Sequence, residues 1–191
     1  MHLILASTSP YRKEMLQRLL NNFDCAPPAC DETPHEGESP EGLAKRLSIE
    51  KAESLIALHP NCWILGSDQT ACIEGRLLGK PGHREAAIEQ LLRASGQSVT
   101  FYSGLALINS TTRIQMHSVI KTRVHFRLLS RQQIERYIDR ELPFDCAGSF
   151  KMEGLGISLF TRIESDDPTA LIGLPLIQLT SFLNEASFII P

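Results

Sequence analysis

Three charged residues are candidates for catalysis because the sequence predicts that they are buried or lie at the end of a strand. They are Arg12, Lys51 and Asp68. Asp68 follows the short apolar run 63–66, which predicts a buried strand, so we expect its carboxylate just beyond the carboxyl end of that strand. A carboxylate there can hold a divalent cation or accept a proton from an attacking water. Asp68 is therefore the first candidate for a catalytic base.

Lys51 falls in the middle of an apolar helical stripe. The stripe follows i+4 spacing, which places its members on one helix face, and consists of Leu43, Leu47, Lys51 and Leu55. A buried ammonium needs an anionic partner, because desolvation otherwise removes its proton. The spacing leaves a substrate phosphate and a structural carboxylate open as partners, and a long lysine can also reach water. Arg46, on a neighbouring face, either serves the same anion or is solvated.

A second anion-binding feature is expected near the N-terminus. Residues 3–6 predict a short strand, and Ser9 followed by Pro10 predicts the start of a helix. The first N–H groups of a helix lack intrahelical partners and attract anions. Ser7 would add a hydroxyl, and Arg12 would point into the protein or a cleft. The alternative is a well-capped helix whose arginine extends to water.

Charged loop residues complete the set. Asp31 and Glu32, in the Pro- and Glu-rich connection 25–40, are candidate ligands for a hard cation beside Asp68, and Lys80 adds a positive charge. Each of these has a plain alternative, since loop charges are usually solvated. Together, however, cations for phosphates and a carboxylate for water are what phosphoryl chemistry needs. The sequence contains no GxxxxGK[ST], so a P-loop enzyme is excluded.

The elements expected to carry these residues predict an α/β architecture. Strands alternate with helices, which favours a mixed β-sheet with surrounding helices. The predicted strands cover residues 3–6, 63–66, 99–108 and 119–128, with a further strand or hairpin ending near 160. The predicted helices begin at residues 10, 40, 84, 130 and 175, and the second runs to about 58. The 191 residues suit one domain, or two small lobes that share a cleft.

Composition narrows the class of protein. The net charge of -3 argues against non-specific binding to nucleic acid, so any phosphate must be met by local cations. Five cysteines without a CxxC pair fit reduced thiols, and the six histidines form no HExxH zinc motif. The apolar N-terminal run is too short for a signal peptide or a membrane span. We therefore expect a cytoplasmic protein without membrane contact.

With these residues in view, the sequence resembles the Maf family of nucleoside triphosphate pyrophosphatases. The resemblance implies an elongated α/β fold with a central cleft, similar in architecture to inosine-triphosphate pyrophosphatases, and frequent homodimers. It also implies a reaction that depends on a divalent cation, Mg²⁺ or Mn²⁺, and releases the nucleoside monophosphate and pyrophosphate. The motifs span nearly the whole chain and are residues 5–13, Asp31-Glu32, Arg46-Leu47, Lys51-Ala52, residues 66–69, residues 79–81, residues 146–150, Asp167-Pro168 and residues 171–175.

The same resemblance implies roles for individual residues. Asp68 would accept the proton of the attacking water and, with Glu32, hold the metal, while Lys51 would act beside it on the phosphates. Lys13 stands where the family usually has a second arginine, which keeps the charge but loses the bidentate fork. The residues expected to bind phosphate are Ser7, Arg12, Lys13, Lys51 and Lys80.

Three motif positions separate the branches of the family: Tyr11, Gln69 and Glu153. The branch similar to dTTP/UTP hydrolases typically has Arg, Thr and Gln there, whereas the present residues resemble the branch that acts on 7-methyl-GTP. Guanine offers N–H donors that Glu153 could accept, and N7-methylation makes the base a cation, which favours an aromatic face such as Tyr11. Ordinary packing of Tyr11 and solvent exposure of Glu153 are the alternatives.

Three functional hypotheses follow. The first is a pyrophosphatase for 7-methyl-GTP or a related modified nucleotide, which removes non-standard nucleotides. The second keeps the chemistry and changes the base to dTTP, UTP or a broad set. The third, of another class, is a nucleotide-binding regulator of cell division. A turnover panel separates the first two, and a folded but inactive Asp68→Asn protein that keeps its cellular effect would favour the third.

Overall fold

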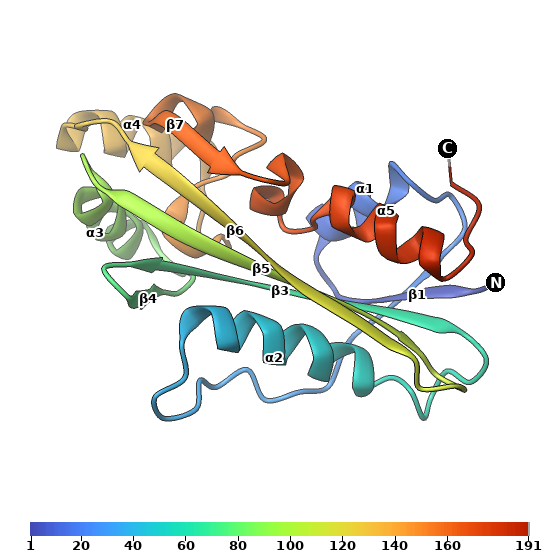
Figure 1. Cartoon of the computed structure of the whole chain (residues 1–191). Coiled ribbons are helices and arrows are strands. Elements are labelled where there is room, and N and C mark those ends of the chain that lie inside the picture. Colours follow the sequence, from blue (N-terminus) through green and yellow to red (C-terminus); the bar gives the residue numbers. More distant parts are fainter. Residues whose placement is uncertain (191) are drawn as a thin grey trace.

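The computed structural model describes residues 1–190, and within that range it contains seven strands and five α-helices (Figure 1). The strands are β1 (Leu3–Ala6), β2 (Asp24–Ala26), β3 (Trp63–Ile73), β4 (Arg76–Leu78), β5 (Ser98–Asn109), β6 (Gln115–Phe126) and β7 (Phe160–Ser165). The helices are α1 (Pro10–Gln17), α2 (Pro40–Glu53), α3 (Arg84–Ala94), α4 (Arg131–Glu141) and α5 (Leu176–Glu185). Short 3-10 helices are η1 (Ala147–Ser149), η2 (Leu155–Leu159) and η3 (Pro168–Ile172).

The strands form one mixed sheet, as the sequence predicted. Their order is β2-β1-β3-β5-β6-β7, with β4 also paired to β3. β1 is parallel to both of its neighbours, and the other pairs are antiparallel. β1 pairs with β3 only as far as Gly66, and β4 pairs with it only from Ala71 onward. Residues 67–70 of β3 are therefore paired on the β5 side and face an opening in the sheet on the other side.

Helices cover both faces of the sheet (Figure 1). Alternate residues of β1 point to opposite faces, so Ile4 and Ala6 pack in a cluster with α2, whereas Leu3 and Leu5 pack with α1 and α5. The continuous apolar run of β1 is thus explained by burial on both faces.

A second core fills the other end of the molecule, between the sheet, α3 and α4. Four phenylalanines meet there edge to face, with ring centroids 4.7 to 5.8 Å apart. They come from β5, β6, β7 and the segment after η1, and are Phe101, Phe126, Phe160 and Phe150. Phe150 thereby anchors residues 145–153 to the sheet.

Two glycines let α2 lie unusually close to the sheet. A Cβ on Gly66 would stand 2.0 Å from the carbonyl oxygen of Ser48, and one on Gly104 would stand 2.2 Å from that of Ala44. Any side chain at these positions would push the helix away. The close approach brings Lys51, on the same face of α2, to the middle of β3.

Local signals for the helices are confirmed. Ser9 accepts a hydrogen bond from the backbone N–H of Arg12 with Pro10 at the first helical position, and Ser130 forms the predicted capping box. The second helix ends at Glu53, five residues before the predicted end.

Two strand predictions are wrong. β3 does not end near residue 66 but continues to Ile73, so Asp68 lies inside the strand rather than beyond its carboxyl end. Pairing with β5 along residues 63–72 extends it. The strand or hairpin predicted to end near Phe160 consists instead of η1 and η2, and β7 begins at Phe160. Gly148 and Ser149 adopt positive φ, which breaks an extended chain there.

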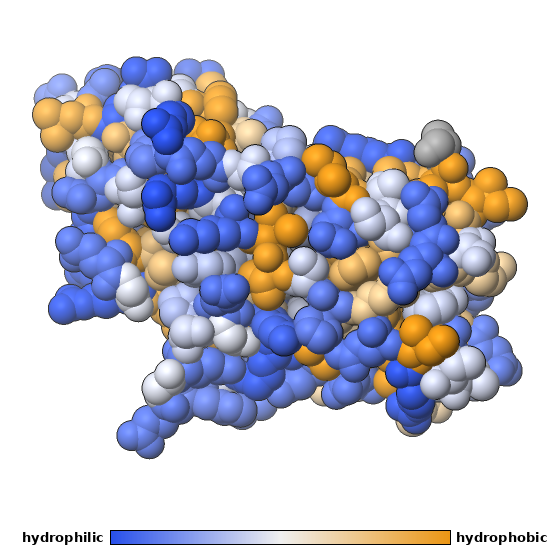
Figure 2. Space-filling model, in the orientation of Figure 1, coloured by the Kyte–Doolittle hydropathy of each residue, from blue (hydrophilic) through white to orange (hydrophobic). Residues whose placement is uncertain are grey.

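Figure 2 shows mostly polar and charged side chains on one face, with hydrophobic residues in small separate groups. Among the described residues, no helix combines the length and apolar character needed to cross a bilayer. All five cysteines are free thiols.

Candidate active site

A cavity of about 710 Å³ lies at the opening in the sheet between β1 and β4. This volume is in the range typical of small-molecule sites. Its walls come from the start of α1, from α2, from β3 and from residues 145–153 and 171–173. The proposed site residues that line it are Ser7, Tyr11, Arg12, Glu32, Lys51, Asp68, Gln69, Lys80 and Glu153.

Lys51 lies between two carboxylates. Its Nζ donates to Asp68 Oδ1 at 2.6 Å and lies 2.7 Å from Glu32 Oε1, and only 7% of its side chain is exposed. The buried ammonium predicted from the apolar stripe is thus confirmed, with carboxylates as partners. An ammonium has a further N–H, which remains available to a phosphate oxygen.

The pKa of Glu32 reflects the charges around Lys51 and Asp68. The hydrogen bond from Lys51 lowers the pKa of the Glu32 carboxyl, and the positive charges of Lys51, Lys80 and Arg12 lower it further against the opposing effect of burial. Burial lowers the pKa of the Arg12 guanidinium, while Asp68 and Glu32 oppose that shift. Three cations and two carboxylates therefore share one end of the cavity, although the chain as a whole is acidic.

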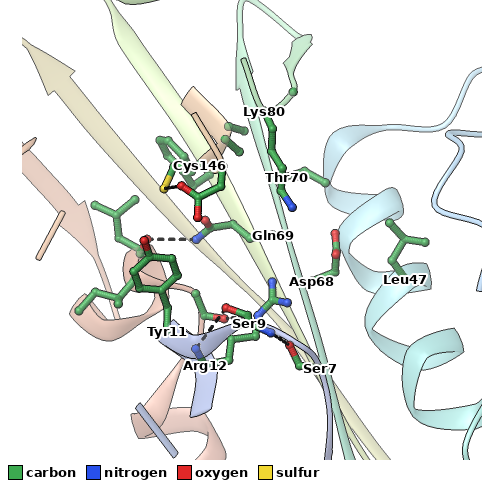
Figure 3. Close-up of a pocket in the computed structure, with 18 of the residues that line it drawn as sticks. Ser7, Ser9, Tyr11, Arg12, Leu47, Asp68, Gln69, Thr70, Lys80 and Cys146 are labelled. Carbon is green, nitrogen blue, oxygen red and sulfur yellow. Dashed lines mark hydrogen bonds between the residues drawn. The ribbon is translucent and has the colours of Figure 1, made fainter. Parts of the chain in front are cut away.

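The turn into α1 forms the floor of this end (Figure 3). Ser7 Oγ accepts from the N–H of Ser9 at 3.1 Å, so its own O–H can still donate to a ligand. Arg12 Nε donates to the carbonyl of Gly173 at 3.1 Å, which leaves the terminal nitrogens of the guanidinium for the cavity. Ser67 Oγ donates to the same carbonyl at 3.2 Å.

Gln69 occupies the other end. Its Nε2 donates to Ser103 Oγ at 3.0 Å and to the carbonyls of Ala170 at 2.8 Å and Leu171 at 3.3 Å. The amide hydrogens are committed to these partners, so what Gln69 can offer a ligand is its carbonyl oxygen. Tyr11 lines the same cavity and is seen in Figure 3 on the same side as Gln69.

The charge around Tyr11 is mostly negative. Burial raises the pKa of the Tyr11 hydroxyl, and Cys146, Asp145 and Glu153 raise it further, whereas Lys151 lowers it. Burial, with Asp145 next, also raises the pKa of the Cys146 thiol to about 12, so this cysteine is a neutral wall residue rather than a nucleophile.

Asp68 and Gln69 are neighbours in β3 and so point to opposite faces of the sheet. Figure 3 shows Asp68 on the side of Leu47 and α2, and Gln69 on the side of Tyr11. Both reach the same cavity because the sheet is open beside residues 67–70. The cavity therefore passes from one face of the sheet to the other.

Comparison with known proteins assigns the chain. The profile of Maf-like proteins matches residues 2–186. The chain belongs to the Maf family. A protein named 7-methyl-GTP pyrophosphatase from Pseudomonas aeruginosa is 52% identical over 189 residues, which cover 99% of this chain and 98% of that protein. One of the same name from Vibrio parahaemolyticus is 50% identical, with 97% and 96% covered.

A third relative of this Maf protein, named 7-methyl-GTP pyrophosphatase from Xanthomonas axonopodis pv. citri, is 51% identical, with 99% and 98% covered. Among solved structures, a nucleoside-triphosphatase or dITP/XTP pyrophosphatase from Mycobacterium abscessus is 14% identical, with a TM-score of 0.47 and 97% and 94% covered. The assignment of a mixed α/β fold rests on the sheet itself and not on that distant similarity.

Not every predicted residue of the Maf site reaches the cavity. Lys13 is exposed and lines a separate depression of about 300 Å³ beside the turn into α1. Asp31 is also exposed, and its carboxylate accepts from the N–H of Thr33. Arg46 bonds carboxylates and carbonyls of its own chain, so of its two proposed roles neither the anion ligand nor the solvated arginine is observed.

The closing Maf motif has a function that sequence reasoning did not assign. Asp167 is 1% exposed, and its carboxylate accepts hydrogen bonds from residues that begin η3 and α5. It thereby shapes residues 168–176, whose carbonyls hold Gln69 and Arg12. The signal was present, because Asp before Pro-Thr is a typical helix cap. The hydrogen-bonded donors are Thr169 N and Oγ1, Ile177 N and Gln178 N.

Proposed function

We propose that this protein hydrolyses 7-methyl-GTP, or a closely related modified nucleotide, to the monophosphate and pyrophosphate, and so removes non-standard nucleotides. The observation that carries the proposal is one cavity with two unlike ends. One end holds Asp68, Lys51 and Glu32, and the other presents Tyr11 and Gln69. The names of the relatives described above support the same substrate.

The charged end suits a triphosphate. Ser7 and the N–H groups at the start of α1 would bind phosphate oxygens, as would the free nitrogens of Arg12. Lys80, in the loop after β4, would also contact the phosphates, and Lys51 would donate its remaining N–H to a phosphate oxygen. These cations would offset the repulsion between the phosphates and the carboxylates of Asp68 and Glu32.

Asp68 would act as the general base. Its Oδ1 is held by Lys51, which leaves the second oxygen to accept the proton of the water. As this water attacks the α-phosphorus, its proton passes to Asp68, the new P–O bond forms and the bond to the bridging oxygen breaks. Pyrophosphate leaves with that oxygen, and the monophosphate keeps the oxygen of the water. General base catalysis of this kind contributes roughly 10²- to 10⁴-fold.

The residues present fit a divalent cation, Mg²⁺ or Mn²⁺. Glu32 and Asp68 stand on either side of one ammonium and would hold the ion together. No group of three or more His, Cys, Asp or Glu side chains is arranged for a metal among the described residues. Two carboxylates suffice for Mg²⁺, which usually keeps waters and takes substrate phosphates as further ligands. A bound ion would neutralise charge on the phosphates during the reaction.

The other end favours guanine over thymine or uracil. Gln69 offers a carbonyl oxygen and Glu153 a carboxylate, which makes two acceptors for the pairing edge of the base. Guanine has adjacent N–H donors on that edge, whereas thymine and uracil have a single N–H and would leave an acceptor unpaired. A positively charged methylated base also gains from the ring of Tyr11 and from nearby Asp145.

A turnover panel with Mg²⁺ tests the proposal. We expect 7-methyl-GTP to be hydrolysed faster than GTP, dTTP or UTP, with pyrophosphate and not orthophosphate released. Faster hydrolysis of dTTP, or release of orthophosphate, would reject it. Asp68→Asn should stay folded and lose activity; if this variant kept a cellular effect on division, the regulator hypothesis would gain support. A cytoplasmic location and a homodimer are further predictions, to be checked by fractionation and light scattering.

A further inference from the structure

Arg46 on α2 holds a dense set of contacts outside the cavity. Its Nε donates to Glu38 Oε1 at 2.8 Å and its Nη2 to Glu38 Oε2 at 2.9 Å, which makes a bidentate pair. Its Nη1 donates to Glu50 Oε2 at 3.0 Å. Only 17% of the arginine side chain is exposed.

Two more bonds reach the backbone on both sides of Glu32. Arg46 Nη1 donates to the carbonyl of Asp31 at 3.4 Å, and Nη2 donates to that of Thr33 at 3.0 Å. Every N–H donor of the guanidinium is therefore used. The arginine holds the residue before Glu32 and the residue after it.

Glu32 depends on such support. Residues 27–39, which the structure describes in full, connect β2 to α2 and belong to no helix or strand. Glu32 is exposed over 63% of its side chain, yet its Oε1 reaches the buried Lys51 at 2.7 Å. A fixed backbone favours such a position for a carboxylate on an irregular segment, and Arg46 bonds that backbone directly on both sides of Glu32.

We propose that Arg46 is a positioning residue that sets the place of the Glu32 carboxylate beside Lys51 and Asp68, and thereby the affinity of the site for a divalent cation. This inference rests on the metal site of the proposed function. Lysine cannot replace the arginine, because a single ammonium cannot serve a bidentate carboxylate and two carbonyls together. Arg46→Lys therefore keeps the charge and removes the attachment.

The test uses Mn²⁺ as the probe and a double-mutant cycle with Glu32→Gln. Mn²⁺ binding to the substrate-free protein is measured by electron paramagnetic resonance, alongside the metal concentration for half-maximal hydrolysis. Arg46→Lys should weaken Mn²⁺ binding about tenfold, as loss of outer contacts to metal ligands typically does. The rate at saturating Mn²⁺ should change much less. In the Glu32→Gln background, Arg46→Lys should have little further effect, because the residue it positions is gone.

Arg84→Lys is the matched control. Arg84 makes a comparable bidentate pair with Asp139, at 2.7 and 3.0 Å, between α3 and α4 and away from the cavity. We expect it to leave Mn²⁺ affinity unchanged. If Arg46→Lys fails to fold, Glu38→Gln weakens the same attachment from the other partner and should raise the Mn²⁺ requirement in the same direction.

Several results would overturn the inference. They are equal effects of Arg46→Lys with and without Glu32, an unchanged Mn²⁺ affinity, and absence of Mn²⁺ binding to the original protein. Failure of the proposed function is separate: a protein that couples Arg46 to Glu32 in Mn²⁺ binding but cleaves no nucleotide would keep the inference and lose the function. A protein that cleaves nucleotides to pyrophosphate but shows no coupling of Arg46 to Glu32 would keep the proposed function and lose the inference.

Discussion

Lys51 Nζ lies 2.6 Å from Asp68 Oδ1, across 17 residues of chain and between a helix and a strand. Glu32 brings a second carboxylate to the same ammonium, so Lys51, Asp68 and Glu32 alone carry one negative charge in excess, beside the positive charges of Arg12 and Lys80. A divalent cation that arrives with phosphates would be attracted to this excess.

Lys51→Met should cost both stability and turnover. Asp68 is 12% exposed at its side chain and would be left without its cation, but Glu32 is largely solvated. We expect a loss of about 2 kcal/mol in the free energy of unfolding, less than the roughly 3–5 kcal/mol of a fully buried pair. Turnover should fall at least ~100-fold. Urea denaturation and kcat/KM measure the two effects. Lost stability with unchanged turnover would make the lysine purely structural.

Gly66→Ala tests the close contact of α2 with β3. The added methyl would lie 2.0 Å from the Ser48 carbonyl oxygen and 2.9 Å from the N–H nitrogen of Ala52, both backbone atoms that cannot rotate away. Stability should fall by about 3 kcal/mol, and activity should fall with it because Lys51 moves. Gly79→Ala is the control for stability, since a Cβ there meets no atom within 4 Å. Similar melting temperatures for the two variants would contradict the prediction.

Glu153→Gln tests recognition of the base. The amide keeps the shape but loses the negative charge and one acceptor, so kcat/KM for 7-methyl-GTP should fall about tenfold or more. Hydrolysis of GTP and dTTP should change less, because neither base is a cation. Glu185→Gln, at the exposed end of α5, removes the same charge away from the cavity. Equal losses for every nucleotide would count against base recognition.

Acid should loosen the segment that carries Glu32. The hydrogen bond from Arg46, followed by that from His35 N–H, lowers the pKa of Glu38 to about 2, and Lys51 lowers that of Glu32. Because both pKa values are depressed in the folded protein, their stabilisation is present above the ordinary value of 4.5 and is lost as the pH falls below it, for Glu38 toward about 2. Unfolding free energy should fall more steeply across this window in the original protein than in Glu38→Gln. Parallel curves would disprove the linkage.

Local patterns carried the sequence-based predictions that succeeded. The start of α1 could be predicted from Ser9 and Pro10, and the burial of Lys51 follows from the period of its own helix. The three-dimensional position of Asp68 could not be found that way, because the length of β3 is determined by pairing with β5, far along the chain. The residues that line the cavity were predicted by family resemblance more than by spacing, with Lys13 as the exception.

Contacts that join distant segments were the least predictable. Arg46 looked like a surface or anion-binding residue because the carbonyls it bonds belong to an irregular loop with no periodic pattern. The 3-10 turns before β7 were missed for a similar reason, since glycine spacing there suits a hairpin equally well. Gln69 is held by carbonyls of η3, about a hundred residues away, and these have no signature in side-chain types.

The opening in the sheet beside residues 67–70 lets two neighbouring residues of β3 face the same cavity, which sets a fixed distance along it. Asp68 and Gln69 are joined by a single peptide unit, so the backbone separation between the proposed general base and the side chain proposed to contact the nucleotide base is constant. A nucleotide whose base docks at Gln69 would always present its first phosphorus to Asp68, however many phosphates follow. The distance from the base to the first phosphorus would then determine which bond is hydrolysed. A nucleoside diphosphate would be cleaved at the same bond, and substituents on the terminal phosphate would not change the position of cleavage.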